Sequence, residues 1–473
     1  MDRNQNAFSE GAKALEARFA RCADFTLRRV DAGLDPAQPV LLCWLDGLVD
    51  GRDLAATLLR PLTEFWRLSA DAADFRARLL GGAVTAWSVT EAAGPDEAAD
   101  ALTHGCCALF PGDAQPALCF ELRAGIGRSV SEPTLEKSVK GGRESFVETL
   151  RVNTALLRRR LATPELKLLE SSLGRRSATK LALLYLEGAA DEALVASLAE
   201  KLDALELDAV LSTGPLEQAL SASKRSPFPQ VLHTERPDRM ALHLAAGRVG
   251  LLADGLPLGL ILPATLAEFM TPGGERSRRG PVGGMLSLLR ALAFLLALLL
   301  PGLYVALAMY HQEMIPTKLL LSMIEAKQKV PFSTALEVLG MLLAFLLLQE
   351  AGLRLPGPMG DTVSIIGALI VGQAAVEARL VSPVAIIVVA AAGIAGYALP
   401  SQDLTAALRL WSVALLLAGA LAGLYGLALG CCLLLWHLAG IESFGRSYLA
   451  PLCEDGPGPR KLLQRLRDRR RAR

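Results

Sequence analysis

The pattern of hydrophobic and polar positions divides the chain in two. From Gly280 to His437, long apolar runs are separated by single charges, whereas the residues before Arg276 mix apolar and polar positions as soluble α/β proteins do. The run between Arg290 and Glu313 holds no Asp, Glu, Lys or Arg, and as a helix it is long enough to cross a hydrocarbon core of about 30 Å. The pattern therefore predicts a water-facing head followed by membrane helices.

Four further apolar runs set the expected topology. They are Val338 to Gln349, Thr362 to Val376, Val384 to Leu399 and Leu410 to Ile441. The last run is longer than one crossing needs, and Gly423, Gly426 and Gly430 within it allow a bend or close packing against a neighbour. We expect four to five transmembrane segments over residues 285–441 and a basic cytosolic tail over residues 442–473, because lysine and arginine gather on the cytosolic side. No signal peptide is apparent, so the head is expected in the cytosol too, and one of the five segments then does not cross.

A short pattern of strand, turn and helix occurs twice in the head. Val40 to Leu45 forms the first buried strand and Lys180 to Leu186 the second, and they end in an L-D-G and an L-E-G corner. In the second copy, a further strand at Leu207 to Ser212 completes a βαβ-like unit. We expect two α/β subdomains, residues 1–128 and residues 165–270.

The second subdomain is expected to end in a β-hairpin, because the run from Arg248 to Pro263 alternates around Asp254-Gly255. Leu211 to Pro237 is rich in proline and polar residues, which is typical of a mobile loop. The expected fold class is a soluble two-subdomain α/β head followed by an all-α polytopic membrane domain.

Residues 129–164 separate the two subdomains and carry the most distinctive polar pattern of the head. A helix from Arg143 to Leu161 is predicted there, with Leu150 on its apolar face. Most of its arginines, Arg158 among them, fall on other faces. Two interpretations stay open. The helix is either a connector with a solvated charged face, or an element of subunit contact or membrane-surface binding, since arginines pair with carboxylates and lipid phosphates.

Candidate chemistry is sparse. The eight cysteines form no C-x-x-C pair, so we expect buried, inert thiols rather than disulfides or zinc ligands. The chain has no phosphate-binding loop, dinucleotide fingerprint, zinc-protease motif or serine nucleophile elbow, and its five histidines are scattered. We therefore expect neither enzyme activity nor a cofactor or metal, and no nucleic acid among the partners.

Polar residues inside or beside the apolar runs are more informative, because an ionisable group there is costly unless it faces protein or water. They are Glu337, Glu350, Gln373, Glu377 and Arg379. Gln373 and Glu377 are four apart and share a helical face. Glu377 either marks the water end of a helix or belongs, with Ser364 and Gln373, to a polar pathway between subunits. Such a pathway needs several copies around an axis, because one helical hairpin cannot enclose water.

Six stretches of the chain closely match one protein family. They are Asp24 to Arg29, Leu45 to Asp50, Glu132 to Arg160, Tyr310 to Met323, Val330 to Val384 and Gly440 to Pro451. With them, nearly the whole chain resembles the A subunit of GerA-type spore germinant receptors. The resemblance implies a place in the inner membrane of a bacterial endospore, with the head and the C-terminal tail facing the core or cytoplasm.

The resemblance also implies partners and an activity. Such subunits form complexes with a transporter-like B subunit and a lipoprotein C subunit, and assemble as pentamers into nutrient-gated channels that release monovalent cations. Membrane lipids are further expected partners. The pathway candidates are Ser364, Gly367, Gln373 and Glu377, and the subunit-contact candidates in the head are Glu132, Arg143, Glu144 and Asn153.

Two departures from the family pattern leave alternatives open. Between Met270 and Leu286 the acidic and aromatic stretch that is usual in the family is missing, and Lys318 stands where a second proline is common. The closest alternative is an accessory channel similar to stage V sporulation protein AF, which amplifies germination without sensing nutrients. The opening L-D-G-L-V-D favours the receptor subunit. A secondary transporter would show two related halves, and no inverted repeat is visible. A passive membrane scaffold is a third class.

Overall fold

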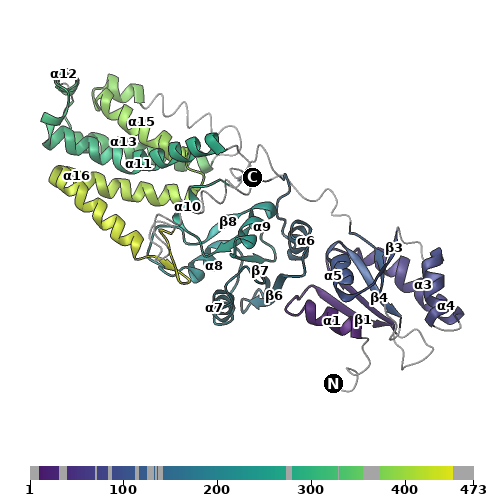
Figure 1. The fold of residues 1–473 in the computed structure, drawn as a ribbon. Coiled ribbons are helices and arrows are strands. Elements are labelled where there is room, and N and C mark those ends of the chain that lie inside the picture. Colours follow the sequence, from purple (N-terminus) through teal and green to yellow (C-terminus); the bar gives the residue numbers. More distant parts are fainter. Residues whose placement is uncertain are drawn as a thin grey trace. The chain divides into compact units, whose positions relative to one another are not determined.

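The computed structural model describes residues 10–30, 40–69, 72–83, 88–111, 117–124, 133, 136, 142–272, 280–328, 330–354 and 372–450. Its contacts divide the chain into two compact units. The first is Met1–Ser221 with Val231–Pro263, and the second is Ala222–Gln230 with Ala264–Arg473. Figure 1 shows strands and helices in the first unit and long helices in the second.

The first subdomain of the head contains a five-stranded antiparallel sheet. Its strands are β1 (Phe25–Val30), β2 (Val40–Leu45), β3 (Val89–Ala92), β4 (Cys106–Pro111) and β5 (Ala117–Glu121), in the order β1-β2-β4-β5-β3. Successive side chains of β2 point to opposite faces, so Leu41 and Cys43 join one hydrophobic cluster and Leu42 joins another. Because both faces are buried, β2 is the continuous apolar run that the sequence predicts.

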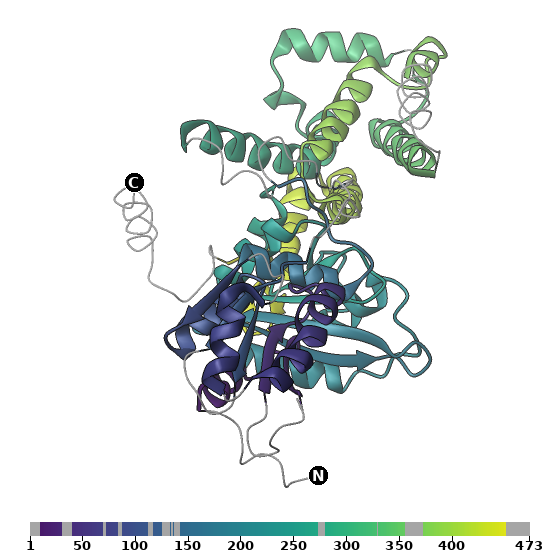
Figure 2. The same cartoon turned by 90° about the vertical axis from the view of Figure 1, so that its right-hand side faces the viewer.

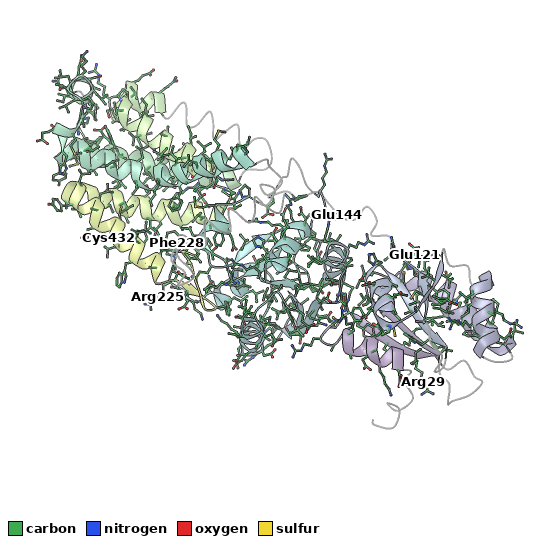
Figure 3. All side chains as sticks on the ribbon, in the orientation of Figure 1. Arg29, Glu121, Glu144, Arg225, Phe228 and Cys432 are labelled. Carbon is green, nitrogen blue, oxygen red and sulfur yellow. The ribbon has the colours of Figure 1, made fainter. Side chains whose placement is uncertain are left out.

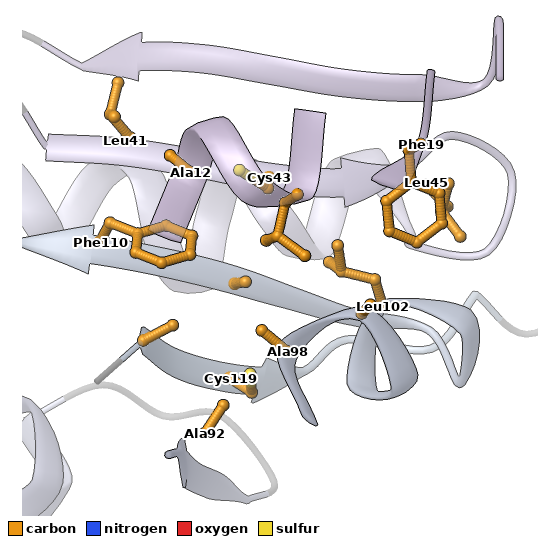
Figure 4. Close-up of a cluster of buried hydrophobic side chains, with 14 of the residues drawn as sticks. Ala12, Phe19, Leu41, Cys43, Leu45, Ala92, Ala98, Leu102, Phe110 and Cys119 are labelled. Atoms are coloured by element: carbon orange, nitrogen blue, oxygen red, sulfur yellow. The ribbon is translucent and has the colours of Figure 1, made fainter. Parts of the chain in front are cut away.

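Helices cover both faces of this sheet. On one face, α1 (Glu10–Arg18) contributes Ala12 and α5 (Pro95–Thr103) contributes Ala98 and Leu102 to the cluster in Figure 4. The elements on the other face are α2 (Gly51–Asp53), η2 (Leu54–Leu59), α3 (Arg60–Leu68), α4 (Ala72–Arg78) and η3 (Leu79–Ala83). There, Leu58 and Phe75 are fully buried.

The second subdomain repeats the first strand for strand. Its strands are β6 (Leu166–Leu173), β7 (Thr179–Leu186), β8 (Leu232–Thr234), β9 (Val249–Ala253) and β10 (Gly259–Leu262), again antiparallel, in the order β6-β7-β9-β10-β8. Its helices are α7 (Glu192–Asp203), α8 (Thr213–Leu220) and α9 (Pro237–Ala245). The corner glycines Gly47 and Gly188 both have positive φ, +90° and +79°, which favours glycine. The repeat predicted from the two corners is therefore confirmed, as is the α/β class of the head.

Two strand predictions have different outcomes. The hairpin around Asp254 is confirmed as β9 and β10, although residues 254–258 connect the strands instead of a two-residue turn. The strand at Leu207 to Ser212 is wrong, and so is the βαβ-like unit. The carbonyls of Leu207 and Asp208 accept hydrogen bonds from the amides of Arg175 and Arg176, so this segment closes the β6–β7 turn and joins no sheet.

The connector helix starts later than predicted, because α6 covers Leu150–Arg160. Residues 142–149 bond to other parts of the head: the amide of Phe146 donates to the carbonyl of Glu235, and the carbonyl of Glu148 accepts from the amide of Gly255. These main-chain groups are therefore unavailable for a helix. Arg158, predicted on an outer face, is instead buried.

The prediction of a mobile loop from Leu211 to Pro237 is also wrong for most of its length. Part of it forms α8 and β8, and residues 222–230 pack within the second unit. The ring of Phe228 lies 6.3 Å from that of Tyr448, and the hydroxyl of Ser226 is 2.9 Å from Nε2 of His437. Figure 3 labels Phe228 and, three positions earlier in the same segment, Arg225. Phe228 is buried, so its packing fixes this segment.

Four long helices dominate the second unit. They are α11 (Gly280–Tyr310), α13 (Thr334–Arg354), α15 (Pro383–Tyr397) and α16 (Gln402–Ala439), with the shorter α10 (Leu266–Phe269), η5 (Gln312–Met314), α12 (Thr317–Lys327) and the strands β11 (Glu442–Ser443) and β12 (Arg446–Ser447). Among the described residues, three stretches are long and apolar enough to cross a membrane, Pro281–Tyr310, Thr334–Ala351 and Gln402–Ala439, whereas Pro383–Tyr397 is shorter. α12 buries none of its residues and lies at one end of the helical unit in Figures 1 and 2.

α16 is broken at the first of the three glycines for which the sequence predicts a bend or close packing. Ala422 and Gly423 leave the helical conformation, and Gly423 has φ +57° and ψ −139°. The hydroxyl of Tyr310, at the end of α11, donates to the carbonyls of Ala420 and Leu421 at 2.9 and 3.1 Å. The break frees these carbonyls from the helical ladder, and the tyrosine satisfies them.

Several predicted features lie outside the described residues. They are Glu132, Ser364, Gly367, most of the run from Thr362 to Val376, the segment 273–279 and the basic tail from residue 451.

The buried thiols of the head are expected to resist alkylation. Burial raises the pKa of the Cys119 thiol to about 12 and raises the pKa of the Cys107 thiol well above its ordinary value. The thiolate is the reactive form, and at pH 8 a thiol of pKa ~12 is ionised in only about one molecule in 10⁴. In the folded full chain, N-ethylmaleimide should modify half-buried Cys106 of the head before Cys43, Cys107 and Cys119, which should stay unmodified until denaturant is added, as peptide mass spectrometry would show. Equal rates for Cys106 and Cys119 would contradict this.

Candidate functional site

A buried carboxylate joins the starts of two membrane helices. Glu337, in the first turn of α13, is 2% exposed, and its Oε2 accepts a hydrogen bond of 3.1 Å from the main-chain amide of Ser382. Ser382 is the N-cap of α15, and its hydroxyl accepts from the amide of Ala385. Both acceptors satisfy free amides at the N-terminus of α15, where the helix dipole favours negative charge.

Other polar side chains lie near this carboxylate. Tyr304 of α11 makes a side-chain hydrogen bond with Ser382, and both line a hollow together with Lys327 and Thr334. Lys327 donates to the hydroxyl of Thr334. Oε1 of Glu337 is buried, and no described residue bonds to it. This polar cluster is therefore able to hold water or a cation beside apolar helices.

The pathway candidates that the structure describes lie a few residues before Ser382, which belongs to the polar cluster. Gln373 and Glu377 lie among residues 372–377, which are helical, and both are exposed on the protomer. Arg379 follows with φ +56°, a left-handed conformation that turns the chain toward Ser382 and α15. The pathway itself stays a prediction, since Ser364 and Gly367 lie outside the described residues.

Removing the buried carboxylate is expected to loosen α15. Glu337→Ala takes away the acceptor of the Ser382 amide, and losing a buried hydrogen bond to a charged group costs about 1.5–3 kcal/mol. Glu350→Ala, in the same helix at an exposed position, is the matched control and should change stability by no more than about 0.5 kcal/mol. Thermal unfolding of the full chain in detergent checks both. Equal effects would mean that Glu337 does not anchor α15.

In the head, a buried ion pair joins the two subdomains. Arg158 of α6 donates from Nε and Nη2 to the two carboxylate oxygens of Asp24, both at 2.8 Å, and each side chain is 1% exposed. Next to Asp24, the amide of Ala23 donates to the carbonyl of Leu168 in β6 at 2.9 Å. The segment before β1 therefore adds to the sheet of the second subdomain, and Arg158 locks it there.

Further contacts fix this joint, which we define by Asp24, α6 and the start of β6. Arg151 of α6 contacts Asp46 at 3.1 Å and Glu170 at 2.9 Å, one in each subdomain. A Cβ at Gly47 would stand 3.0 Å from the carbonyl oxygen of Arg151, so glycine permits the close approach of α6. The buried ammonium of Lys167 donates to the carbonyl of Arg18. These contacts link the two subdomains within the first unit.

The described subunit-contact candidates fall into two groups. Arg143 and Glu144 are exposed, and Glu144 pairs with Arg160 at 2.5 Å. Asn153 is fully buried, and its amide exchanges hydrogen bonds of 2.8 and 2.6 Å with the main chain of Val147. Asn153 therefore holds the segment before α6 inside the protomer. Contact between subunits stays a prediction for this set.

Sequence reasoning missed the ion pair of the joint. Asp24 and Arg158 are 134 positions apart, and helical periodicity placed Arg158 outside the apolar face. The only local signal was that both residues fall in stretches matching the family. Among the described residues, no group of three or more His, Cys, Asp or Glu side chains is placed to hold a metal ion.

Comparison with known proteins gives the family. The chain matches the family described as Bacillus/Clostridium GerA spore germination protein over residues 13–465. It is 34% identical to the uncharacterized membrane protein YfkQ of Bacillus subtilis (strain 168), over 91% of this chain and 83% of that protein. It is also 34% identical to spore germination protein KA of the same organism, over 91% of this chain and 79% of that protein.

A solved structure is also similar. It is the N-terminal domain of the A subunit of the Bacillus megaterium spore germinant receptor GerK3, at 24% identity and a TM-score of 0.43, covering 56% of this chain and 99% of that one. The family match spans both the head and the apolar helices. This chain is a membrane protein, and it belongs to the GerA family of spore germination proteins.

Proposed function

We propose that this chain is the A-type subunit of a nutrient-responsive spore germinant receptor, and that five copies surround an ion-conducting route in the spore inner membrane. Family membership supports the receptor role, because relatives over most of the chain are named spore germination proteins. The proposal includes a transporter-like B subunit and a lipoprotein C subunit as partners, and a head and C-terminal tail that face the spore core.

The observation that carries the ion route is the exposure of polar groups beside the membrane helices. Gln373, Glu377 and Arg379 are exposed on the protomer, in the stretch that leads into α15. Such groups are costly against lipid, so either water or another copy of the chain shields them. Copies arranged around an axis provide both, because each contributes one polar stretch to a shared interior.

The gate follows from the same arrangement. The B subunit binds a small nutrient and shifts the equilibrium of the A oligomer from a closed toward an open state. The free energy of this shift equals the difference between the nutrient-binding free energies of the two states. The exposed residues Arg143 and Glu144 would lie between neighbouring heads. Glu337 and Ser382 would hold the start of α15 in place beside the route.

Gln373→Ala is expected to slow potassium release when nutrient is added to spores, by about tenfold if the side chain lines the route and contributes ~1.4 kcal/mol to passage. Gln402→Ala, at an exposed position at the start of α16, is the matched control and should release potassium at the rate of the unaltered chain. Ion electrodes in a spore suspension measure both. Unaltered release by the Gln373 variant, at normal protein abundance, would remove this residue from the route.

A further inference from the structure

The long helix α16 turns back on itself at Gly423. Ala422 and Gly423 leave the helical conformation, and the rings of Trp411 and His437, on either side of the break, lie 5.8 Å apart. These two residues are 26 positions apart, so in one straight helix about 39 Å would separate them. The second half of α16, residues 424–439, therefore runs back beside the first half, residues 402–421, as the yellow ribbon in Figure 1 shows.

Glycines bring the two halves of α16 and α11 into close contact. A Cβ at Gly426 of the second half would collide with the carbonyl oxygen of Ala418 in the first half. A Cβ at Gly419 of the first half would stand 2.8 Å from the carbonyl oxygen of Gly302 in α11. Small residues let helix backbones approach closely inside a membrane, where packing has to hold helices together. These glycines therefore stabilise the bent form of α16 against α11.

The bend lies level with the end of α11. A Cβ at Gly423 would stand 2.9 Å from Cε1 of His311, and the hydroxyl of Tyr310 donates to the two carbonyls that the break frees. Carbonyls outside a helix need a partner inside a bilayer, and this hydroxyl is their partner. Tyr310 ends the apolar stretch Pro281–Tyr310, which is long enough to cross a membrane. The bend therefore reaches the face of the membrane to which α11 leads.

The chain after α16 returns to the segment that precedes α11. The amide of Leu266 in α10 donates to the carbonyl of Tyr448 at 2.9 Å, and the ring of Phe269 lies 6.2 Å from that of Tyr448. Three residues separate β10 from α10 and ten separate α10 from α11, too few in each case for a helix to cross a bilayer. Residues 440–448 therefore lie on the face of the membrane from which α11 starts, which is the face of the head.

We infer that α16 crosses the membrane twice, as a helical hairpin whose bend lies on the face opposite the head. The first half is about 30 Å long and the second about 24 Å, lengths that a bilayer accommodates by small changes in tilt or thickness. Arg409 lies two turns from the start of the first half, close enough for its long side chain to reach the headgroups. The C-terminal tail then starts on the side of the head. This path of the chain does not depend on the proposed ion route.

Thiol labelling from each face of the membrane tests this path. An impermeant maleimide is applied to vesicles of both orientations that hold the full chain with one added cysteine, and peptide mass spectrometry distinguishes that cysteine from the native ones. Gln402→Cys and Glu442→Cys place a thiol before and after α16, Glu313→Cys places one beside the bend, and Glu206→Cys marks the head. All four residues are exposed, so the substitutions leave the packing intact.

The Gln402, Glu442 and Glu206 variants are expected to react only in vesicles that have the face of the head outside. The Glu313 variant should react only in vesicles of the other orientation. If Glu442→Cys reacts on the face opposite Gln402→Cys, α16 crosses once. If Glu313→Cys reacts on the face of the head, the bend does not reach the other side. Either result would overturn the inference.

A crosslink between the two halves tests the hairpin itself. Trp411→Cys with His437→Cys, in a chain whose Cys431 and Cys432 are replaced by serine, should be joined by a short bismaleimide in the membrane. Gly283→Cys with Met309→Cys is the matched control, because these positions are also 26 apart but lie in the continuous helix α11, and this pair should not join. Failure of the first pair to join, or equal joining of the control pair, would contradict a hairpin.

Discussion

Arg158→Ala is expected to destabilise the joint of the head by about 3–5 kcal/mol, because the substitution leaves a buried carboxylate without its counter-charge. Asp24 is 1% exposed, and both of its oxygens accept from Arg158 at 2.8 Å. Water cannot replace the guanidinium without opening the contact between the segment before β1 and β6. The two subdomains should then separate more often, while each keeps its own sheet.

Amide hydrogen exchange of the full chain in detergent measures this opening. Exchange of β6 amides should speed up in the Arg158→Ala variant by the factor that corresponds to the lost free energy. Arg18→Ala is the control: Arg18 and Glu165 form an ion pair at 3.1 Å that is exposed, and such pairs contribute about 0–1 kcal/mol.

A double variant separates the charge from the packing at this joint. Arg158→Met with Asp24→Leu replaces the ion pair by apolar side chains and should recover much of the stability, since buried pairs exchanged for apolar groups are often neutral. If Arg158→Ala exchanges as slowly as Arg18→Ala, the buried pair does not lock the subdomains together.

Gly423→Ala is expected to destabilise the membrane helices for two reasons. At φ +57° and ψ −139° any other residue is strained by about 1–3 kcal/mol. A Cβ would also stand 2.9 Å from Cβ of Tyr310 and from Cε1 of His311, and overpacking of this kind typically costs about 1–3 kcal/mol. Straightening α16 would relieve the strain but would break the hydrogen bonds of Tyr310 to Ala420 and Leu421.

Gly340→Ala is the matched control for this substitution. Gly340 lies inside α13 with nothing within 4 Å of a built Cβ, so alanine should be neutral or stabilise by up to about 1 kcal/mol through its higher helix propensity. Tyr310→Phe should lose about 1 kcal/mol, because it removes the donor to the freed carbonyls. Thermal unfolding of the full chain in detergent ranks the three variants. A Gly423→Ala protein as stable as Gly340→Ala would mean that α16 does not break at Gly423.

Features fixed by local sequence could be predicted. β2 and β7 are apolar runs that end at glycine corners. A corner with positive φ favours glycine at one position, so the repeated corner could be found in the sequence and indicated the duplicated sheet. A bend in α16 was one of two roles that local sequence allowed for Gly423, Gly426 and Gly430, since the run is too long for one crossing, and the break falls at the first of these glycines. These signals lie within a few residues of the feature that they specify.

Features that depend on distant partners could not be predicted. Residues 142–149 do not form a helix, because main-chain groups of this segment hydrogen-bond to the main chain of Glu235 and of Gly255. Both partners are far away in the sequence. Arg158 is buried because it pairs with Asp24 of the first subdomain, which is far away in the sequence. In the membrane half, periodicity finds helices, but mean hydropathy alone cannot tell which of their faces pack together.

The polar residues of the membrane half could be identified as a class but not placed. The rule that ionisable groups near apolar helices face protein or water singled out Glu337 and Glu377 equally. In the protomer, Glu337 is buried against the N-terminus of α15, whereas Glu377 is exposed. Burial depends on how helices pack, which single-sequence patterns do not encode.

Conductance of the purified receptor in a planar bilayer tests the central claim most directly. The complex of this chain with its B and C subunits should carry monovalent cations when nutrient is added and stay closed without it. The Gln373→Ala complex should show a smaller current, and the Gln402→Ala complex the full one. A complex that is correctly assembled and binds nutrient, yet passes no current in either condition, would contradict an ion route through this subunit.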